Sequence, residues 1–426
     1  MTFATLRRAA LGASLFSLLL PLAATAQSAG FSPQNPPVTP GVTVLLEDPA
    51  FFPLVEGKRA GLITNPTGVD ARLRSTVDLL HDNPAVTLAA LFGPEHGVRG
   101  DAYAGDKVDD TTDPKTGVPV YSLYGATRRP KPEWLENLDV MIYDIQDIGS
   151  SSYTYIYTMA YAMEACGEAG IPFLVLDRPN PVGADYIDGP VINTEEYSTF
   201  VGLYNIAYMY GMTPGETAMM FNADYNTTKC ELTVVPMNGY HRSMRQWDTG
   251  LPFVPTSTHI PHAETSFFYS LTGIMGEIRN GLNIGVGYTL PFETIAAPWI
   301  DREQLTDALN AKNLPGIHFR PISYKPKYAA YKDEMCHGVQ IFISDYKAVR
   351  PVTAQIHIIE TLQKLYPGEG VFTDARAQGS LFDEVLGTDS IRQRILAGET
   401  ADAIIASYQD RVKEFEKTRS KHLIYD

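Results

Sequence analysis

Apolar runs of strand length alternate with helical segments through the first half of the chain, and this alternation constrains the fold most. Strands are predicted over 60–64, 86–92, 140–145 and 172–176. Helices are predicted over 76–81 and 155–169. Strands that alternate with helices favour parallel pairing. We therefore expect an α/β fold built on a doubly wound parallel sheet.

The second half of the chain is less regular. Strands are predicted over 232–236 and 339–344, and helices over 353–365 and 401–417. Thr213 and Glu216 have the spacing of a capping box, so a helix is expected to begin there. A chain of 426 residues is longer than one hydrophobic core usually spans, so we expect two domains.

The N-terminus has the pattern of a secretory signal peptide. Arg7 and Arg8 precede an apolar stretch over 9–20, and small residues over 23–26 supply the cleavage site. We expect cleavage near Ala26, a flexible leader over 27–40, and a periplasmic or secreted protein. No later apolar stretch is long enough to span a bilayer, so no stable membrane insertion is expected.

Charge and cysteine content exclude other classes. The net charge of −15 lacks the basic footprint of nucleic-acid binders, so no nucleic-acid partner is expected. Three cysteines allow at most one disulfide, and buried thiols are the better expectation. No phosphate-binding loop, dinucleotide fingerprint, serine-hydrolase elbow or zinc-protease motif is present. We expect no cofactor and no metal.

Polar residues follow the apolar part of four predicted strands. The carboxyl ends of parallel strands meet at one edge of a sheet, where ligands bind. We expect a cleft there that contains Asn65, Glu95, His96, Asp144, Gln146, Asp147, Asp177, Arg178 and Asn180. An alternative for two members is that Asp177 and Arg178 pair with each other and brace the turn.

Glu95 and His96 are the sharpest candidates in this set. They follow the predicted strand 86–92 after a Gly-Pro turn, which would place Glu95 at the exposed end of the strand. A carboxylate beside an imidazole is a plausible acid/base pair. The alternative is a capped turn with a solvated glutamate.

Long motifs throughout the chain resemble one bacterial family. They lie at 61–68, 93–97, 113–117, 119–125, 144–149, 153–156, 177–183, 211–216 and 336–340. They are similar to the exo-β-N-acetylmuramidase (NamZ-type) glycoside hydrolases. The resemblance implies a Rossmann-like domain, assigned here to 41–250, and a smaller C-terminal α/β domain, assigned to 251–426. The active site would lie in the cleft between them.

The resemblance also implies catalytic roles. Glu95 would be the catalytic carboxylate. From the sequence itself, His96 is expected to orient Glu95 or contact substrate, and the alternative is a purely structural histidine. Glycosidases usually use two carboxyls. Asp144, Asp147 and Glu293 are candidates for the second, and the 2-acetamido group of the substrate is the alternative nucleophile. Tyr155 is expected to contact the sugar, and Tyr288 and Glu293 to approach from across the cleft.

The chain departs from the family where arginine is usual. Serines occupy 150–152, and Val286 replaces the arginine of a glycine-spaced segment. N-acetylmuramic acid carries a lactyl carboxylate, which arginine binds well. Arg178 and His259 are expected to bind the lactyl carboxylate in place of the missing arginines, and Arg99 is the next candidate.

The expected function is the release of N-acetylmuramic acid from the non-reducing end of peptidoglycan fragments, in cell-wall turnover or recycling. Peptidoglycan-derived saccharides would be the partners. Two alternatives remain at this point: an exo-glycosidase on another amino sugar or glycan, and a non-catalytic envelope-glycan binding protein.

Overall fold

The computed structural model describes residues 37–95, 97–100, 111–125, 127–278, 281–369, 371–372 and 380–426. The predicted signal peptide, most of the predicted leader and His96 lie outside the described residues. The described end of the leader packs into the fold, because Val38 is fully buried and Thr39 forms a β-bridge with Asn238.

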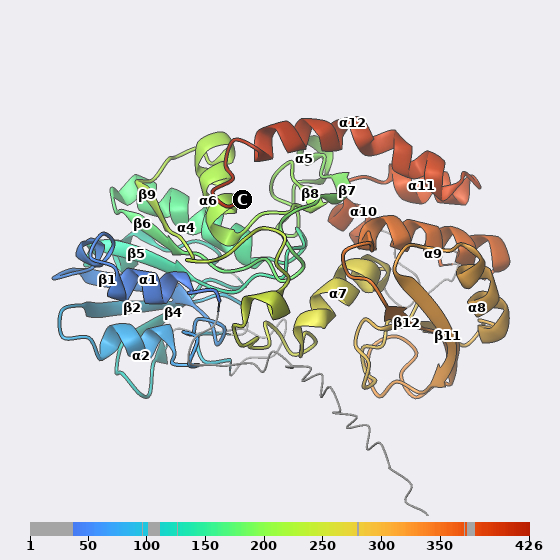
Figure 1. The fold of residues 1–426 in the computed structure, drawn as a ribbon, viewed down its shortest axis with the longest axis horizontal. Coiled ribbons are helices and arrows are strands. Elements are labelled where there is room, and N and C mark those ends of the chain that lie inside the picture. The colour runs from blue at the N-terminus through green and yellow to red at the C-terminus, as the bar shows by residue number, and fades with distance from the viewer. Residues whose placement is uncertain are drawn as a thin grey trace, which may run out of the picture.

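A seven-stranded sheet forms the main layer, in the order β3-β4-β2-β1-β5-β6-β9 (Figure 1). Its strands are β1 (Arg59–Thr64), β2 (Thr87–Gly93), β3 (Thr111–Thr112), β4 (Pro119–Ser122), β5 (Val140–Asp144), β6 (Phe173–Leu176) and β9 (Leu232–Val235). All neighbours pair in parallel except β3 with β4. The parallel strands have the order of a Rossmann fold, so the predicted doubly wound sheet is confirmed.

Both faces of this sheet are covered by helices. Adjacent residues of β1, Leu62 and Ile63, enter two different hydrophobic cores. Such two-sided burial explains why the strands are continuous apolar runs. The core that contains Leu62 includes α1 (Gly41–Glu47) and α2 (Thr76–His81); the opposite core includes α3 (Pro132–Leu135), α4 (Tyr155–Ala169) and α6 (Pro214–Met220).

Local capping fixes where several helices begin and end. The side chain of Ser75 accepts a hydrogen bond from the backbone N–H of Val77 at the start of α2. Gly170 ends α4 in the left-handed conformation, with φ of 68°. The capping box predicted at Thr213 and Glu216 is present at the start of α6.

The C-terminal part contains a second, antiparallel sheet in the order β10-β12-β11. The strands are β10 (Thr294–Ala297), β11 (Ile317–Tyr324) and β12 (Cys336–Ile343). The helices are α7 (Ala263–Gly276), α8 (Arg302–Ala311), α9 (Pro351–Leu365), α10 (Ser380–Leu386), α11 (Ser390–Leu396) and α12 (Ala401–Arg419). Figure 1 shows α12 crossing from this sheet toward the larger one.

Shorter elements complete the described chain. They are β7 (Asp188–Val191), which pairs with β8 (Ala207–Met209), α5 (Thr194–Tyr197), 3₁₀ turns at Phe52–Leu54 and Gln246–Thr249, and a π-turn at Phe221–Tyr225.

The C-terminal tail returns to the larger sheet. The hydroxyl of Tyr425 donates to Asp177 over 2.6 Å, and the guanidinium of Arg419 donates to the carbonyls of Ala184 and Gly211. The core around α7 and α9 also takes in Tyr208 of β8. The two parts of the chain are therefore tied together at both places.

Two further expectations concern thiols and membranes. The cysteines at 166, 230 and 336 are all buried free thiols, as expected. Within the described ranges, no helix is long and apolar enough to cross a membrane.

Candidate active site

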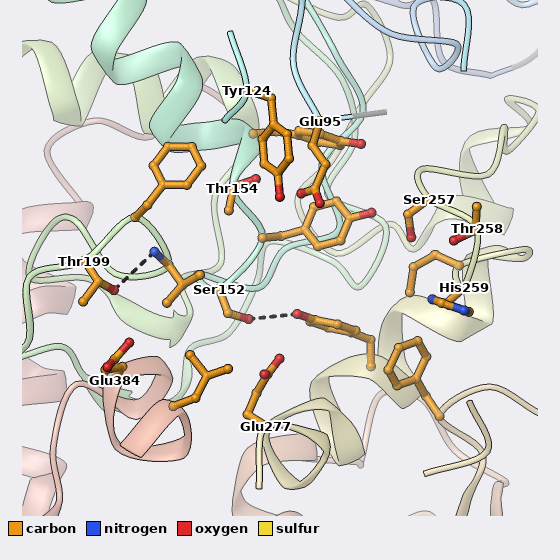
Figure 2. A pocket seen from close by; sticks show the side chains of 18 of the residues that line it. Glu95, Tyr124, Ser152, Thr154, Thr199, Ser257, Thr258, His259, Glu277 and Glu384 are labelled. Atoms are coloured by element: carbon orange, nitrogen blue, oxygen red, sulfur yellow. Dashed lines mark hydrogen bonds between the residues drawn. The ribbon is translucent and has the colours of Figure 1, made fainter. Parts of the chain in front are cut away.

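A cavity of about 790 Å³ opens beside the carboxyl ends of β2 and β4 (Figure 2). Its volume is in the range of small-molecule sites. The N-terminal part contributes the loops after β2 and β4, the start of α4 and residues 199–201. The C-terminal part contributes the loop 257–260, α7 and α10.

Two glutamates enter this cavity from opposite walls. Figure 2 shows Glu95, which follows β2, pointing toward the side from which Glu277 projects. Glu277 is the residue at which α7 ends, and both side chains belong to half-buried residues. A third carboxylate, Glu384 of α10, also lines the cavity.

Glu95 lies against tyrosines. The hydroxyl of Tyr124 hydrogen-bonds to Glu95, and burial together with the charge of Glu95 raises the pKa of Tyr124 to about 12. Tyr153 and Tyr155 also lie near enough to be affected by the Glu95 charge. Tyr124 therefore stays a hydrogen-bond donor to the carboxylate throughout the neutral range.

Aromatic rings form one wall of the cavity. The ring of Tyr153 meets those of Tyr155 and Tyr269 edge-on, at centroid distances of 5.0 and 5.9 Å. The hydroxyl of Tyr155 donates to the carbonyl of Thr256 over 2.7 Å, which fixes the ring. Aromatic faces suit the apolar side of a sugar ring, while carboxylates and hydroxyls bind its polar groups.

The serines over 150–152 connect the two parts of the chain. The hydroxyl of Ser150 lies 2.8 Å from that of Ser270, and the hydroxyl of Ser152 lies 3.1 Å from that of Tyr269. Figure 2 shows the Ser152 bond at the cavity wall. The serines at 150 and 152 are therefore hydrogen-bonded to uncharged hydroxyl groups of α7, namely those of Ser270 and Tyr269.

The structure brings three of the predicted site residues to the cavity, namely Glu95, Tyr155 and His259. The Nε2 atom of His259 lies 3.3 Å from the hydroxyl of Tyr328. His96 falls outside the described residues.

Asp144 and Arg178 do not line the cavity; they bind each other. The Arg178 guanidinium donates to both carboxylate oxygens of Asp144, over 2.5 and 2.9 Å, and Thr76 donates to the same carboxylate. Both are almost fully buried. The alternative of an ion pair between Arg178 and Asp177 is wrong, because the Arg178 guanidinium binds Asp144. Asp177 instead accepts hydrogen bonds from the hydroxyls of Thr213 and Tyr425 and from the backbone N–H of Arg178.

Three predicted amides are likewise engaged outside the cavity. Asn65 accepts hydrogen bonds from Thr67, and it lies beside Tyr155. Gln146 donates to the carbonyls of Asp147 and Pro179, and Asn180 donates to that of Met212. These side chains satisfy backbone groups of the turns that follow the strands.

Asp147 is buried and lies outside the cavity lining. Its carboxylate accepts hydrogen bonds from the hydroxyl of Tyr210 and from the backbone N–H of Gly149, while its Oδ1 atom has no partner within the described part of the chain. Burial raises the pKa of Asp147 to about 6, although both bonds oppose the rise.

Asp147→Asn is expected to change how stability depends on pH. The folded pKa of about 6 exceeds the unfolded value of about 3.9, so the wild type loses stability as pH rises from about 4 to above 6. The variant lacks this loss, so its stability relative to wild type should rise by up to about 3 kcal/mol across that window. Urea unfolding at several pH values measures the difference, and parallel curves would contradict it.

Tyr288 and Glu293 do not approach the cavity from across it. The ring of Tyr288 stacks on Tyr324 at 4.5 Å, and Glu293 contacts Gln340 of β12. Burial raises the pKa of Glu293 above its usual value. The three carboxyls predicted as partners of Glu95 thus all lie outside the cavity lining, and Glu277 lies in it.

Sequence reasoning missed Glu277 and Arg128. Glu277 ends a helix, α7, that was not predicted, although Phe267, Leu271 and Ile274 have helical spacing. Arg128 follows the quoted motif 119–125 by three residues and lines the cavity. Within the described chain, no three histidines, cysteines or carboxylates gather where they could hold a metal ion.

Comparison with known proteins assigns both halves of the chain to one family. The family model for the N-terminal part of exo-beta-N-acetylmuramidase NamZ matches residues 60–264, and the model for its C-terminal part matches 267–425. The peptidoglycan beta-N-acetylmuramidase NamZ of Bacillus subtilis (strain 168) is 46% identical over 416 residues, which are 97% of this chain and 98% of the relative.

Solved structures agree with this assignment. Two DUF1343 family proteins from Bacteroides fragilis match with TM-scores of 0.85 and 0.73, at 44% and 29% identity. Each match covers 91% of this chain and 99% of the other. The segments matched by the two family models both contribute walls to the cavity. The chain therefore belongs to the exo-β-N-acetylmuramidase NamZ family and is a glycoside hydrolase.

Proposed function

We propose that this enzyme releases N-acetylmuramic acid from the non-reducing end of peptidoglycan fragments. The activity named for the Bacillus subtilis relative supports the substrate class. The observation that carries the proposal is the cavity itself, in which Glu95 and Glu277 face each other beside an aromatic wall (Figure 2). Carboxylates and tyrosines in such an arrangement suit a sugar ring and the chemistry of its glycosidic bond.

Glu95 acts as the general acid in this proposal. Its proton passes to the glycosidic oxygen while the bond from that oxygen to C1 of the muramyl ring breaks. The Tyr124 hydroxyl holds the Glu95 carboxyl in place, since it hydrogen-bonds to it. Water finally supplies a hydroxyl group to C1 and returns a proton to the enzyme.

Glu277 is the second carboxylate. It lies in the opposite wall, so it faces the other side of a ring held against the tyrosines. From there it attacks C1, activates the water, or holds the 2-acetamido group. The anomer that is released first distinguishes these courses, because direct attack by water inverts C1 and both other routes retain its configuration.

The expected result with synthetic substrates is a clear preference for the muramyl sugar. The wild-type enzyme should hydrolyse para-nitrophenyl N-acetyl-β-muramide with a higher kcat/KM than the corresponding N-acetylglucosaminide. The two sugars differ only in the lactyl group, so the ratio isolates its recognition. A preference for the glucosaminide would instead support a glycosidase on another amino sugar.

We also propose that the protein is exported for cell-wall turnover. The basic and apolar pattern of residues 1–26 supports export, and an exported enzyme would meet the peptidoglycan of the cell wall. N-terminal sequencing of the protein from its host would begin at Gln27 if cleavage follows Ala26, and at Met1 or Thr2 if the segment is retained.

A further inference from the structure

Arg128 is a cavity residue that the proposed chemistry leaves without a role. It lies in the loop after β4, and its guanidinium carbon is 4.1 Å from the centroid of the Phe200 ring. Both residues line the cavity. Among the ion pairs of the described chain, Arg128 has none, whereas its neighbour Arg129 pairs with Glu168.

Phe200 holds the guanidinium carbon over the face of its ring. A guanidinium that stacks on an aromatic face keeps its N–H donors, which lie in its plane, available at the edge. An arginine edge binds a carboxylate through two parallel hydrogen bonds. Phe200 therefore braces a donor pair that has the geometry for a carboxylate.

The charge of the cavity makes a cation necessary for an anionic ligand. Glu95, Glu277 and Glu384 line it, and the whole chain carries a net charge of −15. A carboxylate that enters such a site without a positive partner would be repelled and poorly solvated. Arg128 and His259 are the cations among the described lining residues.

Arg128 lies on the same side of the cavity as Glu95. The hydroxyl of Tyr124 bonds to Glu95, and the nearby charge of Arg128 partly opposes the rise in the pKa of Tyr124. A lactyl group sits on O3 of the ring whose C1 bond is cleaved. Its receptor must therefore belong to the subsite that holds the general acid, as Arg128 does.

We propose that Arg128, braced by Phe200, binds the lactyl carboxylate of the muramyl residue that is released. This inference rests on the proposed function. It replaces the expected roles of two other arginines, since Arg178 is bound to Asp144 and Arg99 to Asp78 and Asp113. His259 is the competing cation, and its Nε2 atom is already near Tyr328.

The test compares para-nitrophenyl N-acetyl-β-muramide with its lactyl methyl ester, which has nearly the same shape and no charge. For wild type, kcat/KM should be about 30-fold higher on the free acid, as one charge-assisted pair provides. In Arg128→Gln this ratio should fall to about 1, mainly through KM for the acid. Arg128→Lys keeps the positive charge but loses the paired N–H donors of the guanidinium, so its ratio should lie between those of wild type and Arg128→Gln.

Two matched variants serve as controls. Arg129→Gln removes an adjacent arginine that lies outside this cavity, so the ratio should stay near the wild-type value. A ratio that remains high in Arg128→Gln, or that collapses only in His259→Asn, would overturn the assignment. Those outcomes would leave the proposed function standing. A wild type that hydrolyses only the glucosaminide would instead overturn the proposed function and, with it, the role of Arg128.

Discussion

Glu95→Gln is expected to lower kcat on muramyl saccharides by at least about 10²-fold, the usual scale of general acid catalysis. Glutamine keeps the shape of the side chain and can still accept the Tyr124 hydrogen bond, but it has no proton to give. The loss should depend on the leaving group. It should be largest for a natural sugar leaving group and smallest for a dinitrophenolate, which departs without protonation.

The variant Glu277→Gln distinguishes the role of Glu277 from that of Glu95. If Glu277 acts on C1 or on the attacking water, its loss should persist with the dinitrophenyl glycoside. Circular dichroism and urea unfolding show whether each variant is folded. Turnover near the wild-type level in folded Glu95→Gln protein, with the sugar leaving group, would refute the assignment.

Asp144→Asn is expected to destabilise the fold by about 3–5 kcal/mol, because it leaves the buried guanidinium of Arg178 without its counter-charge. The side chain of Asp144 is fully buried and that of Arg178 is 6% exposed, so water cannot solvate the orphaned charge. Urea unfolding measures the change. In the fraction that stays folded, kcat should remain near the wild-type value, since Asp144 lies outside the cavity lining.

A surface ion pair provides the matched control for this variant. Asp139 pairs with Arg59 at 2.9 Å, but both side chains are well exposed. Asp139→Asn is therefore expected to change the unfolding free energy little. A stable Asp144→Asn enzyme that has lost its activity would place Asp144 in the chemistry instead.

Local signals predicted the elements of the larger sheet well. The helices at 76–81 and 155–169 have the predicted bounds, because capping at Ser75 and the glycine at 170 mark an end of each. Apolar runs located β1, β2, β5 and β6 to within a residue or so, since burial on both faces leaves polar residues only at the ends of these strands.

The site was harder to predict because polar residues at a sheet edge can either bind a ligand or form structural contacts within the protein. Asp144 ends its strand, and Arg178 and Asn65 follow theirs. Tertiary folding pairs Arg178 with Asp144, whereas Asn65 accepts a hydrogen bond from the nearby backbone N–H of Thr67. Nothing local to Asp144 distinguishes a carboxylate that binds a buried arginine from one that binds substrate. Glu277 faces Glu95 only because α7 packs against the segment 150–152, a contact between distant parts of the chain.

The most direct test of the account is the product released from a defined peptidoglycan fragment. We expect wild-type enzyme to release free N-acetylmuramic acid from a fragment whose non-reducing end is that sugar. It should leave intact the same fragment capped at that end by N-acetylglucosamine, until the cap is removed by a glucosaminidase. Mass spectrometry of the products measures both. Release of N-acetylglucosamine from the capped fragment, or cleavage at internal bonds, would contradict the account.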